Sequence, residues 1–231
     1  MDMATIYKNR FSTEERTAKD AIWQVLCRHF FQKYVPYDAV VLDLGAGFCE
    51  FLRHIQCKER IAVDINDQVA QFAPEGTRVI LAPAHQLVDK VADNSVDIVF
   101  ASNFFEHLPD KDTFIATLVE VRRVLRPGGK LLVLQPNLRV LGGAYWDFVD
   151  HQIPLTDRTL VEAVTMVGLK AIESRSRFLP YTTRSRIPQH PFLVRLYLMF
   201  PPVWYILGGQ AWLVAIKPPS VNQAESVGGK L

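Results

Sequence analysis

The sequence predicts a doubly wound α/β domain built on a mostly parallel sheet, and two observations lead to this prediction. Short, nearly all-apolar strands recur along the first 135 residues, and helical patterns lie between them; the strands are expected at 39–44, 60–64, 77–82, 95–101 and 129–135. Alternation of strand and helix implies parallel strands with right-handed crossovers, and continuous apolar strands are typical of sheets covered on both faces. Ligands in such folds bind beyond the carboxyl ends of the strands.

Helices are predicted where apolar residues recur with helical spacing. Ser12-x-x-Glu15 has the spacing of a capping box and opens a long helix, whose apolar face is formed by Ala18, Ile22, Leu26 and Phe30. A second helix is expected over 111–125, with one face formed by Phe114, Leu118, Val121 and Leu125. Beyond Pro136 the alternation loosens, and we expect a helix at 156–167, a strand at 169–178, a helix near 191–199 and a strand at 210–217.

Composition excludes several classes of protein. The chain has 231 residues, of which 49% are hydrophobic and 22% charged, as in ordinary globular domains. A net charge of +2 is too small to indicate nucleic-acid binding. The cysteines are Cys27, Cys49 and Cys57; their odd number and lack of a metal-binding spacing suggest free thiols, so we assign no metal ligands. The first residues lack the pattern of a signal peptide, and we expect a cytoplasmic protein.

Residues 192–216 are long and apolar enough to raise the question of a membrane span, because Arg195 is their only charge. Pro201-Pro202 and Gly208-Gly209 divide the run into pieces shorter than the roughly 20 residues that a spanning helix needs. We therefore expect a short buried helix and an edge strand here. Contact with a membrane surface, or with a lipid-linked substrate, is the alternative.

The most informative motif is Val41-Leu42-Asp43-Leu44-Gly45-Ala46-Gly47, an apolar strand that ends in a glycine turn. Glycine permits a positive φ and leaves room for a ligand, and a helix that follows at once directs its amide groups toward that ligand. Asp64 ends the next strand, where a carboxylate can accept two hydrogen bonds from a ribose diol. These residues predict a site for a cofactor that contains a nucleoside; the alternative is a tight turn without a ligand.

The residue that follows the glycines distinguishes between cofactors. A dinucleotide fingerprint has a third glycine where this chain has Glu50, whose negative charge would lie near a pyrophosphate. Asp43 and Glu50 instead suit a cofactor with positive charge and no phosphate. S-adenosylmethionine (SAM), with its sulfonium and ammonium groups, fits this requirement, whereas NAD and FAD do not.

Over residues 38 to 137 the chain resembles the class I SAM-dependent methyltransferases, in particular small bacterial enzymes with one such domain. The resemblance depends on the glycine motif, Ala62-Val63-Asp64, Val96–Asn103, Phe105-Glu106-His107-Leu108 and Val124-Leu125-Arg126-Pro127-Gly128-Gly129. It implies seven strands, of which the last two form an antiparallel hairpin at the sheet edge. It also implies a single domain over 1–217, with a helical segment at 1–37, acceptor-side insertions at 138–155 and 179–209, and a disordered tail at 218–231.

The resemblance further implies a set of cofactor contacts, which are Asp43, Gly45, Ala46, Gly47, Glu50, Asp64, Ile65, Ala84, His85 and Asn103. The chain departs from the family at two positions. Cys49 replaces a usual glycine, and Pro83 stands where many members have an aspartate for the adenine amino group. We expect backbone groups of Ala84 and His85 to bind the adenine in its place.

Methyl transfer to a hydroxyl needs a base, and histidine suits this task near neutral pH. His151 follows an aromatic run in the loop that faces the acceptor in this fold, so it is our candidate base; a histidine that only packs in the loop is the alternative. Glu106-His107 is interpreted as a pair that organises a loop. The expected acceptor contacts are Tyr145, Trp146, Tyr181, Arg184, Arg186 and His190, with the two arginines available for a phosphate or carboxylate.

Residues 136–147 and 179–183 resemble methyltransferases found with bacterial glycan and polysaccharide genes, though less specifically than the cofactor half resembles its family. The favoured function is O-methylation of a hydroxyl on a sugar or similar polar acceptor. The acceptor is a small molecule or a glycan, either free or linked to a phosphate or a lipid. Two alternatives remain at this point: methylation of a small aromatic or isoprenoid metabolite, and a SAM-binding regulatory protein without catalysis.

Overall fold

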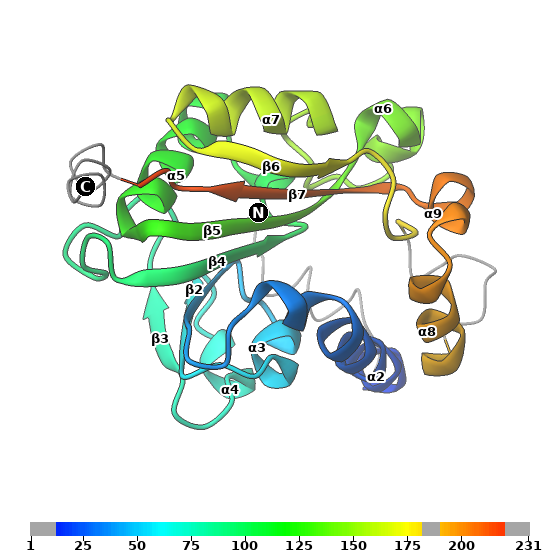
Figure 1. Cartoon of the computed structure of the whole chain (residues 1–231), viewed down its shortest axis with the longest axis horizontal. Helices are drawn as coiled ribbons and strands as arrows, with labels where there is room; N and C mark the ends of the chain where they lie inside the picture. Colours follow the sequence, from blue (N-terminus) through cyan, green and yellow to red (C-terminus); the bar gives the residue numbers. More distant parts are fainter. Residues whose placement is uncertain (1–12, 182–189, 220–231) are drawn as a thin grey trace, which may run out of the picture.

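The computed structural model describes residues 13–181 and 190–219, which form a seven-stranded sheet between two helical layers (Figure 1). The strand order is β3-β2-β1-β4-β5-β7-β6. Strands β1 to β5 pair in parallel, and β7 is antiparallel to both of its neighbours. The strands are β1 (Val40–Leu44), β2 (Glu59–Asp64), β3 (Arg78–Leu81), β4 (Val96–Ser102), β5 (Leu125–Pro136), β6 (Lys170–Arg175) and β7 (Gln210–Ile216). The predicted fold class is confirmed.

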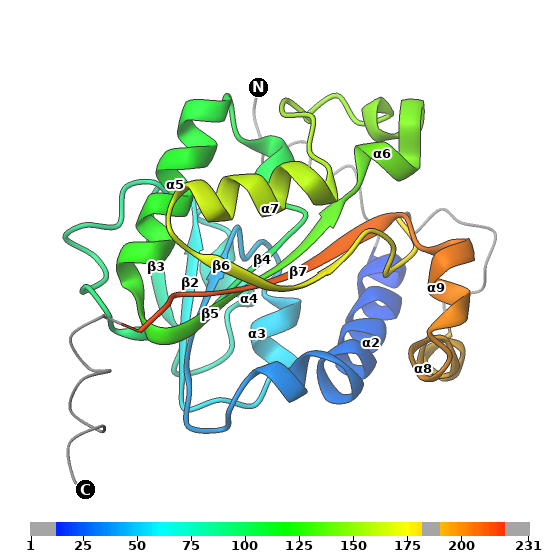
Figure 2. The same ribbon diagram turned by 45° about the horizontal axis from the view of Figure 1, so that its top comes forward.

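The helices are α2 (Thr13–His29), η1 (Phe31–Tyr34), α3 (Glu50–His54), α4 (Val69–Phe72), η2 (Phe105–His107), α5 (Lys111–Val124), α6 (Leu138–Leu141), η3 (Gly142–Trp146), α7 (Asp157–Met166), α8 (Pro191–Met199) and α9 (Pro202–Leu207). Helices α5 and α7 cover one face of the sheet, and α2 and α3 cover the other (Figures 1 and 2). Each face has its own apolar core, because the strands present buried residues to both sides.

Local signals account for the helices on the first face. Asp110 caps α5 by accepting a hydrogen bond from the Thr113 amide at 2.7 Å. Thr156 forms a capping box with Thr159 at the start of α7, and Gly168 follows that helix with a φ of +79°. The predicted ends of both helices agree with the structure to within one residue. Ser12, the predicted cap of the first helix, lies outside the described residues.

The C-terminal strands differ from expectation in one respect. β7 was expected as an edge strand, but it lies between β5 and β6 and is buried over all but its last residue. β6 forms the edge. The chain leaves β6, passes through α8 and α9, and returns between two strands, so the long crossover allows β7 to pair on both sides. A central strand must be apolar because both of its faces are buried, so the apolar composition of β7 does not indicate an edge strand.

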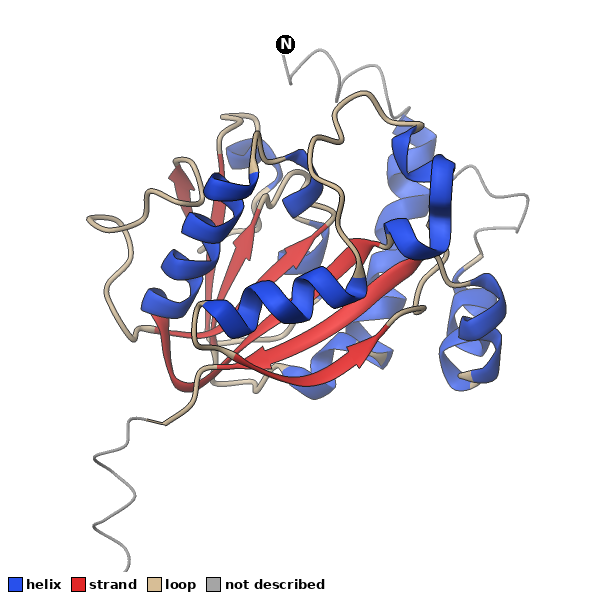
Figure 3. Cartoon of the chain, turned by 90° about the horizontal axis from the view of Figure 1, so that it is seen from above, coloured by secondary structure: helices blue, strands red, loops and turns tan. Residues whose placement is uncertain are grey.

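The expected burial of the helix near 191–199 is wrong, although its position is confirmed. α8 contains no buried residue, and with α9 it stands at the outer end of the molecule beside α2 (Figures 1 and 3). One side of α8 packs through Val194, Tyr197 and Leu198 on the core beneath α2, while several large apolar side chains on its other side are exposed. Among the described residues, no helix is long and apolar enough to cross a membrane.

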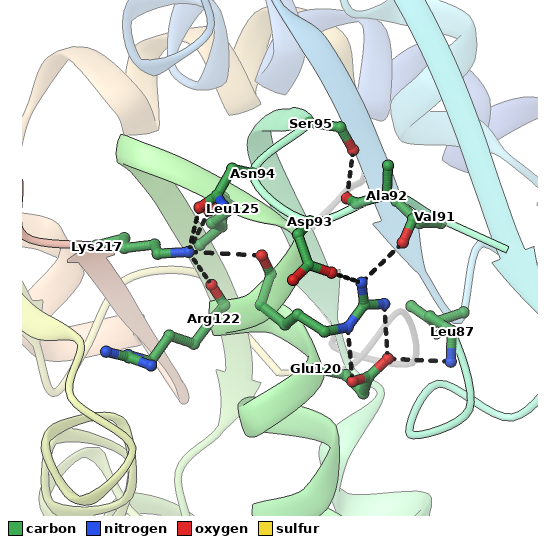
Figure 4. A network of polar contacts seen from close by, with 11 residues as sticks. Leu87, Val91, Ala92, Asp93, Asn94, Ser95, Glu120, Arg122, Leu125 and Lys217 are labelled. Atoms are coloured by element: carbon green, nitrogen blue, oxygen red, sulfur yellow. Dashed lines mark hydrogen bonds and ion pairs between the residues drawn. The ribbon is translucent and has the colours of Figure 1, made fainter. Parts of the chain in front are cut away.

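A polar network fixes the segment between β3 and β4 to α5 (Figure 4). Glu120 accepts two hydrogen bonds from the Arg123 guanidinium at 2.9 Å and a third from the Leu87 amide at 3.1 Å. Arg123 also donates to the Val91 carbonyl at 2.9 Å. The Lys217 ammonium, at the end of β7, donates at 2.7 Å to the Asn94 side chain and to two carbonyls near the end of α5. This network holds the loop that carries Ala84 and His85.

Candidate active site

The glycine turn between β1 and α3 has the backbone that the motif predicts. Gly45 and Gly47 have φ values of +66° and +51°. A Cβ atom at Gly45 would collide with the ring of Phe104, which packs on the turn from the end of β4. Cys49, at the usual glycine position, also has a positive φ of 55°, and its thiol is buried. Because this conformation is unfavourable for a residue with a Cβ, packing of the side chain must offset a cost of about 1–2 kcal/mol.

Asp64 lies at the carboxyl end of β2 with its side chain held by two backbone amides. Gly47 donates to Oδ2 and Asn66 donates to Oδ1, each at 2.9 Å. A carboxylate oxygen has two acceptor positions, so each oxygen can accept a further bond. Ile65, the next residue, is 65% exposed and offers an apolar surface beside the carboxylate. This combination suits a ribose diol joined to an adenine ring.

Acidic groups gather around the turn. Asp43 is buried, and its burial, followed by the charges of Glu50 and Asp64, raises its pKa well above the ordinary value. Glu50 forms an ion pair with Lys19 at 3.0 Å. A cavity of about 290 Å³ lies beside these residues and is lined by Arg16, Thr17, Asp20, Phe48, Glu50, Arg53 and Phe72. The charged side chains of this lining are two arginines, Arg16 and Arg53, and two acids, Asp20 and Glu50, so the lining alone does not select a cationic cofactor over a pyrophosphate.

The segments at the ends of β3 and β4 carry the remaining residues that were predicted to contact the cofactor. Pro83 accepts a hydrogen bond from the Gln86 amide at 2.9 Å, which forms a turn around the buried Ala84 and the half-buried His85. Asn103 follows β4 with a φ of +48°, and its amide bonds the Leu134 carbonyl at 2.9 Å. A non-glycine residue in this conformation after a central strand is common at ligand sites. The expected contacts from Ala84, His85 and Asn103 remain proposals.

The loop after β5, which was predicted to face the acceptor, brings titratable side chains together with η2. Oε1 of Glu106 lies 3.7 Å from Nε2 of His107 and 4.0 Å from Nε2 of His151. Nδ1 of His107 is 3.0 Å from the Asp150 carbonyl, and the Glu106 carbonyl accepts bonds from the Gln152 and Ile153 amides at 2.7 and 3.2 Å. These bonds fit the interpretation of Glu106-His107 as a pair that organises a loop. Burial raises the pKa of the Glu106 carboxyl.

Aromatic rings surround His151. Phe148 stacks on it with a centroid distance of 5.4 Å, and the hydroxyl of Tyr181 lies 3.5 Å from its Nε2. Tyr145 is fully buried, and its hydroxyl bonds the Ile153 carbonyl at 2.5 Å and the Leu155 amide at 3.2 Å. Tyr145 therefore supports the loop and offers no surface to an acceptor in this structure, whereas Trp146 is 47% exposed.

Two predicted acceptor contacts, Arg184 and Arg186, lie outside the described residues. His190 is exposed and caps α8 by accepting a hydrogen bond from the Phe192 amide at 3.2 Å. Gln135 is a site residue that the sequence analysis missed: it ends β5 and donates to Oε2 of Glu106 at 2.8 Å. The signal for it was an amide side chain directly after the apolar run 131–134.

Comparisons with known proteins agree with this geometry. Residues 42–133 match the family model described as a methyltransferase domain. A probable methyltransferase, ltbC of Aspergillus luteorubrus, is 29% identical over 118 residues, which cover 44% of this chain and 41% of that protein. The chain spans about two fifths of the length of the curated relatives that it matches.

Two solved structures show the same fold. A SAM-dependent methyltransferase from Archaeoglobus fulgidus has a TM-score of 0.64 at 20% identity, with 94% of this chain and all of that chain covered. A putative methyltransferase of Haloferax volcanii, solved with the Trm112 methyltransferase activator, has a TM-score of 0.64 at 19% identity over 88% of this chain and 93% of that one. Residues 42–133 thus resemble a methyltransferase domain, and the fold is that of class I SAM-dependent enzymes. The matched methyltransferase domain and this fold imply S-adenosyl-L-methionine as the cofactor.

Proposed function

We propose that this protein is a SAM-dependent O-methyltransferase whose acceptor is a hydroxyl of a sugar or similar polar molecule. The observation that carries this proposal is the position of His151, buried beside the Glu106 carboxylate in the loop after β5. Imidazole can receive a proton near neutral pH. The sequence resemblance to glycan-associated enzymes in residues 136–147 and 179–183 supports the sugar.

Each half of the domain has a distinct task in this proposal. The cofactor supplies an electrophilic methyl group when it is bound. Asp64 holds its ribose, and Asp43 and Glu50 neutralise its positive end. The aromatic rings around His151 exclude water and position the acceptor, while His151 receives the proton that the hydroxyl loses.

The test uses methyl-labelled SAM with polar and lipid-soluble extracts of the native host as sources of acceptor. We expect label in a base-stable O-methyl group, and a turnover at least about a hundredfold lower for His151→Gln with unchanged SAM affinity. His29→Gln, which alters an exposed histidine on α2, is the matched control. Label on nitrogen or sulfur of the acceptor, or full turnover by His151→Gln, would contradict the proposal.

The exposed apolar side of α8 and α9 supports an acceptor that is linked to a lipid. We call this surface the α8–α9 apolar face, and its most exposed members are Phe192, Leu193, Leu196, Met199, Phe200, Tyr205, Ile206 and Leu207. Arg195 is exposed on α8, Arg28 is exposed in the last turn of α2 beside it, and residues 190–216 contain no acidic side chain. An apolar face with flanking cations is typical of helices that lie on anionic membranes.

We therefore propose that the α8–α9 apolar face rests on an anionic bilayer from which the acceptor is presented. Vesicles of phosphatidylglycerol and phosphatidylcholine should co-sediment the protein, and vesicles of phosphatidylcholine alone should do so less. Ile206→Glu should weaken sedimentation, whereas Met166→Glu, at an exposed apolar residue on α7, should not. Binding that survives Ile206→Glu, or that is lost equally in both variants, would exclude this face. Self-association of the unmutated protein without vesicles would indicate a second copy as the partner instead.

A further inference from the structure

Three potential metal ligands converge at the acceptor side from two separate segments. Glu106 and His107 belong to η2 after β4, and His151 belongs to the loop before α7. One ligand atom from each of the three lies within 4.8 Å of the others. The ligand atoms around a tetrahedral ion lie 2.0–2.1 Å from the ion and roughly 3.3 Å from one another. Small side-chain rotations that shorten the distances between these three ligand atoms by about 0.5 to 1.5 Å would therefore place them around one ion.

The hydrogen bonds around Glu106 and His107 leave one ligand atom of each available to a common centre, whereas the Tyr181 hydroxyl, 3.5 Å from Nε2 of His151, would have to turn away from that atom. Nδ1 of His107 lies 3.0 Å from the Asp150 carbonyl, which can only accept, so the proton is on Nδ1 and the lone pair is on Nε2. Gln135 occupies Oε2 of Glu106 at 2.8 Å. Oε1 of the same carboxylate is buried, has no hydrogen-bond donor among the described residues, and faces both imidazoles. A buried acceptor without a donor is costly unless something else satisfies it.

We propose that Glu106, His107 and His151 bind one divalent transition-metal ion of the Zn²⁺ or Mn²⁺ type. Two imidazoles and a carboxylate with an open position form a ligand set that such ions use for catalysis. The Asp150 carbonyl and Gln135 would act in the second shell, where they fix the ring of His107 and the Glu106 carboxylate. The sequence shows no metal pattern because 44 positions separate His107 from His151, and only the fold brings them together.

This inference rests on the proposed O-methylation and gives His151 a different route of action. A hydroxyl bound at the open position has its pKa lowered by the ion, as water does on a catalytic metal. Its proton passes to solvent, the oxygen forms the new bond to the methyl carbon, and the sulfur–methyl bond breaks with its electrons remaining on sulfur. His151 then acts as a ligand, and Glu106 neutralises part of the ion's charge.

The test is calorimetric titration of chelator-treated protein with ZnCl₂ and MnCl₂. We expect one site of micromolar or tighter affinity in the unmutated chain. Glu106→Gln and His151→Gln should weaken it by at least about a hundredfold, and Gln135→Ala should weaken it by about 10- to 100-fold as a second-shell change. His29→Gln should bind like the unmutated protein.

A second measurement covers the case in which a variant fails to fold. Co²⁺ added to the unmutated protein should give the visible absorption of nitrogen and oxygen coordination, and X-ray absorption should show two imidazole ligands. Absence of both, or equal affinity in Glu106→Gln and the unmutated protein, would overturn the metal site. Methyl transfer that persists undiminished in chelator-treated protein would refute the metal's role but leave O-methylation intact. A bound ion at these residues with no transfer to any hydroxyl would instead count against the proposed function.

Discussion

Replacement of Asp64 gives the sharpest test of the cofactor site. Its carboxylate holds the glycine turn through backbone hydrogen bonds and, in our proposal, also accepts hydrogen bonds from the ribose. It accepts hydrogen bonds from the Gly47 and Asn66 amides at 2.9 Å, and its remaining acceptor positions face the end of β2 where a ribose would lie. Asp64→Ala removes both functions. Bonds to a charged acceptor contribute about 1.5 to 3 kcal/mol, so SAM and S-adenosylhomocysteine should bind roughly ten to 150 times more weakly.

Asp64→Asn separates the charge from the shape. An amide oxygen can still accept from Gly47, and a neutral acceptor forms bonds about half as strong as a charged one, so a loss of about 1 kcal/mol, or roughly fivefold, is expected. Asp67→Asn removes an exposed carboxylate three residues away and controls for the general loss of negative charge. Isothermal calorimetry with S-adenosylhomocysteine measures all three, and circular dichroism verifies folding. Unchanged affinity in Asp64→Ala, or an equal loss in Asp67→Asn, would refute the ribose assignment.

Three further predictions concern charge, strain and packing. Burial and neighbouring acids raise the pKa of Asp43, and a cationic cofactor favours the ionised form of its carboxyl, so SAM affinity should increase as pH rises through that pKa. Calorimetry in buffers of different ionisation enthalpy should detect the proton that Asp43 releases when SAM binds. Asp43→Asn should abolish this proton release. Gly45→Ala should cost at least about 1–2 kcal/mol of stability in urea denaturation and abolish SAM binding, because φ is +66° and Phe104 leaves no room. Arg123→Met should lower the free energy of unfolding by about 2–3 kcal/mol, because Glu120 would remain nearly buried without its partner. A loss below about 0.5 kcal/mol would show that the polar network does not hold the loop between β3 and β4 on α5.

The parts of the fold that the sequence predicts well are those determined by local interactions. The strand–glycine turn and the bounds of α5 and α7 each depend on residues only a few positions apart. The errors concern long-range placement. The residues of β7 and α8 have similar apolar compositions, yet β7 is central in the sheet and α8 presents much of its surface to solvent. Periodicity alone does not distinguish a buried apolar segment from one whose partner lies outside the chain.

The same distinction applies to the site. The glycine turn and Asp64 belong to one strand–helix–strand unit, so their spacing predicts their proximity, and their hydrogen bond joins Gly47 to Asp64 at 2.9 Å. The acceptor side is assembled from the ends of β4 and β5 and a later loop. Nothing in the spacing of Glu106, Gln135 and His151 indicates that they meet, although each is a polar residue next to apolar sequence. Such sites become predictable only once the strand order is known.

The four residues after β4 connect the two halves of the site physically. Phe104 packs on the glycine turn of the cofactor half, and the Glu106 carbonyl accepts bonds from two amides of the loop that holds His151. Displacement of Phe104 from Gly45 by a bound cofactor would therefore be transmitted through η2 to Glu106 and His151. A short segment with contacts to both halves can couple the sites in this way. Phe104→Ala should then reduce any dependence of acceptor affinity on bound S-adenosylhomocysteine, while each ligand binds alone with nearly its original affinity. Equal coupling in the variant and the unmutated protein would show that the two halves act independently.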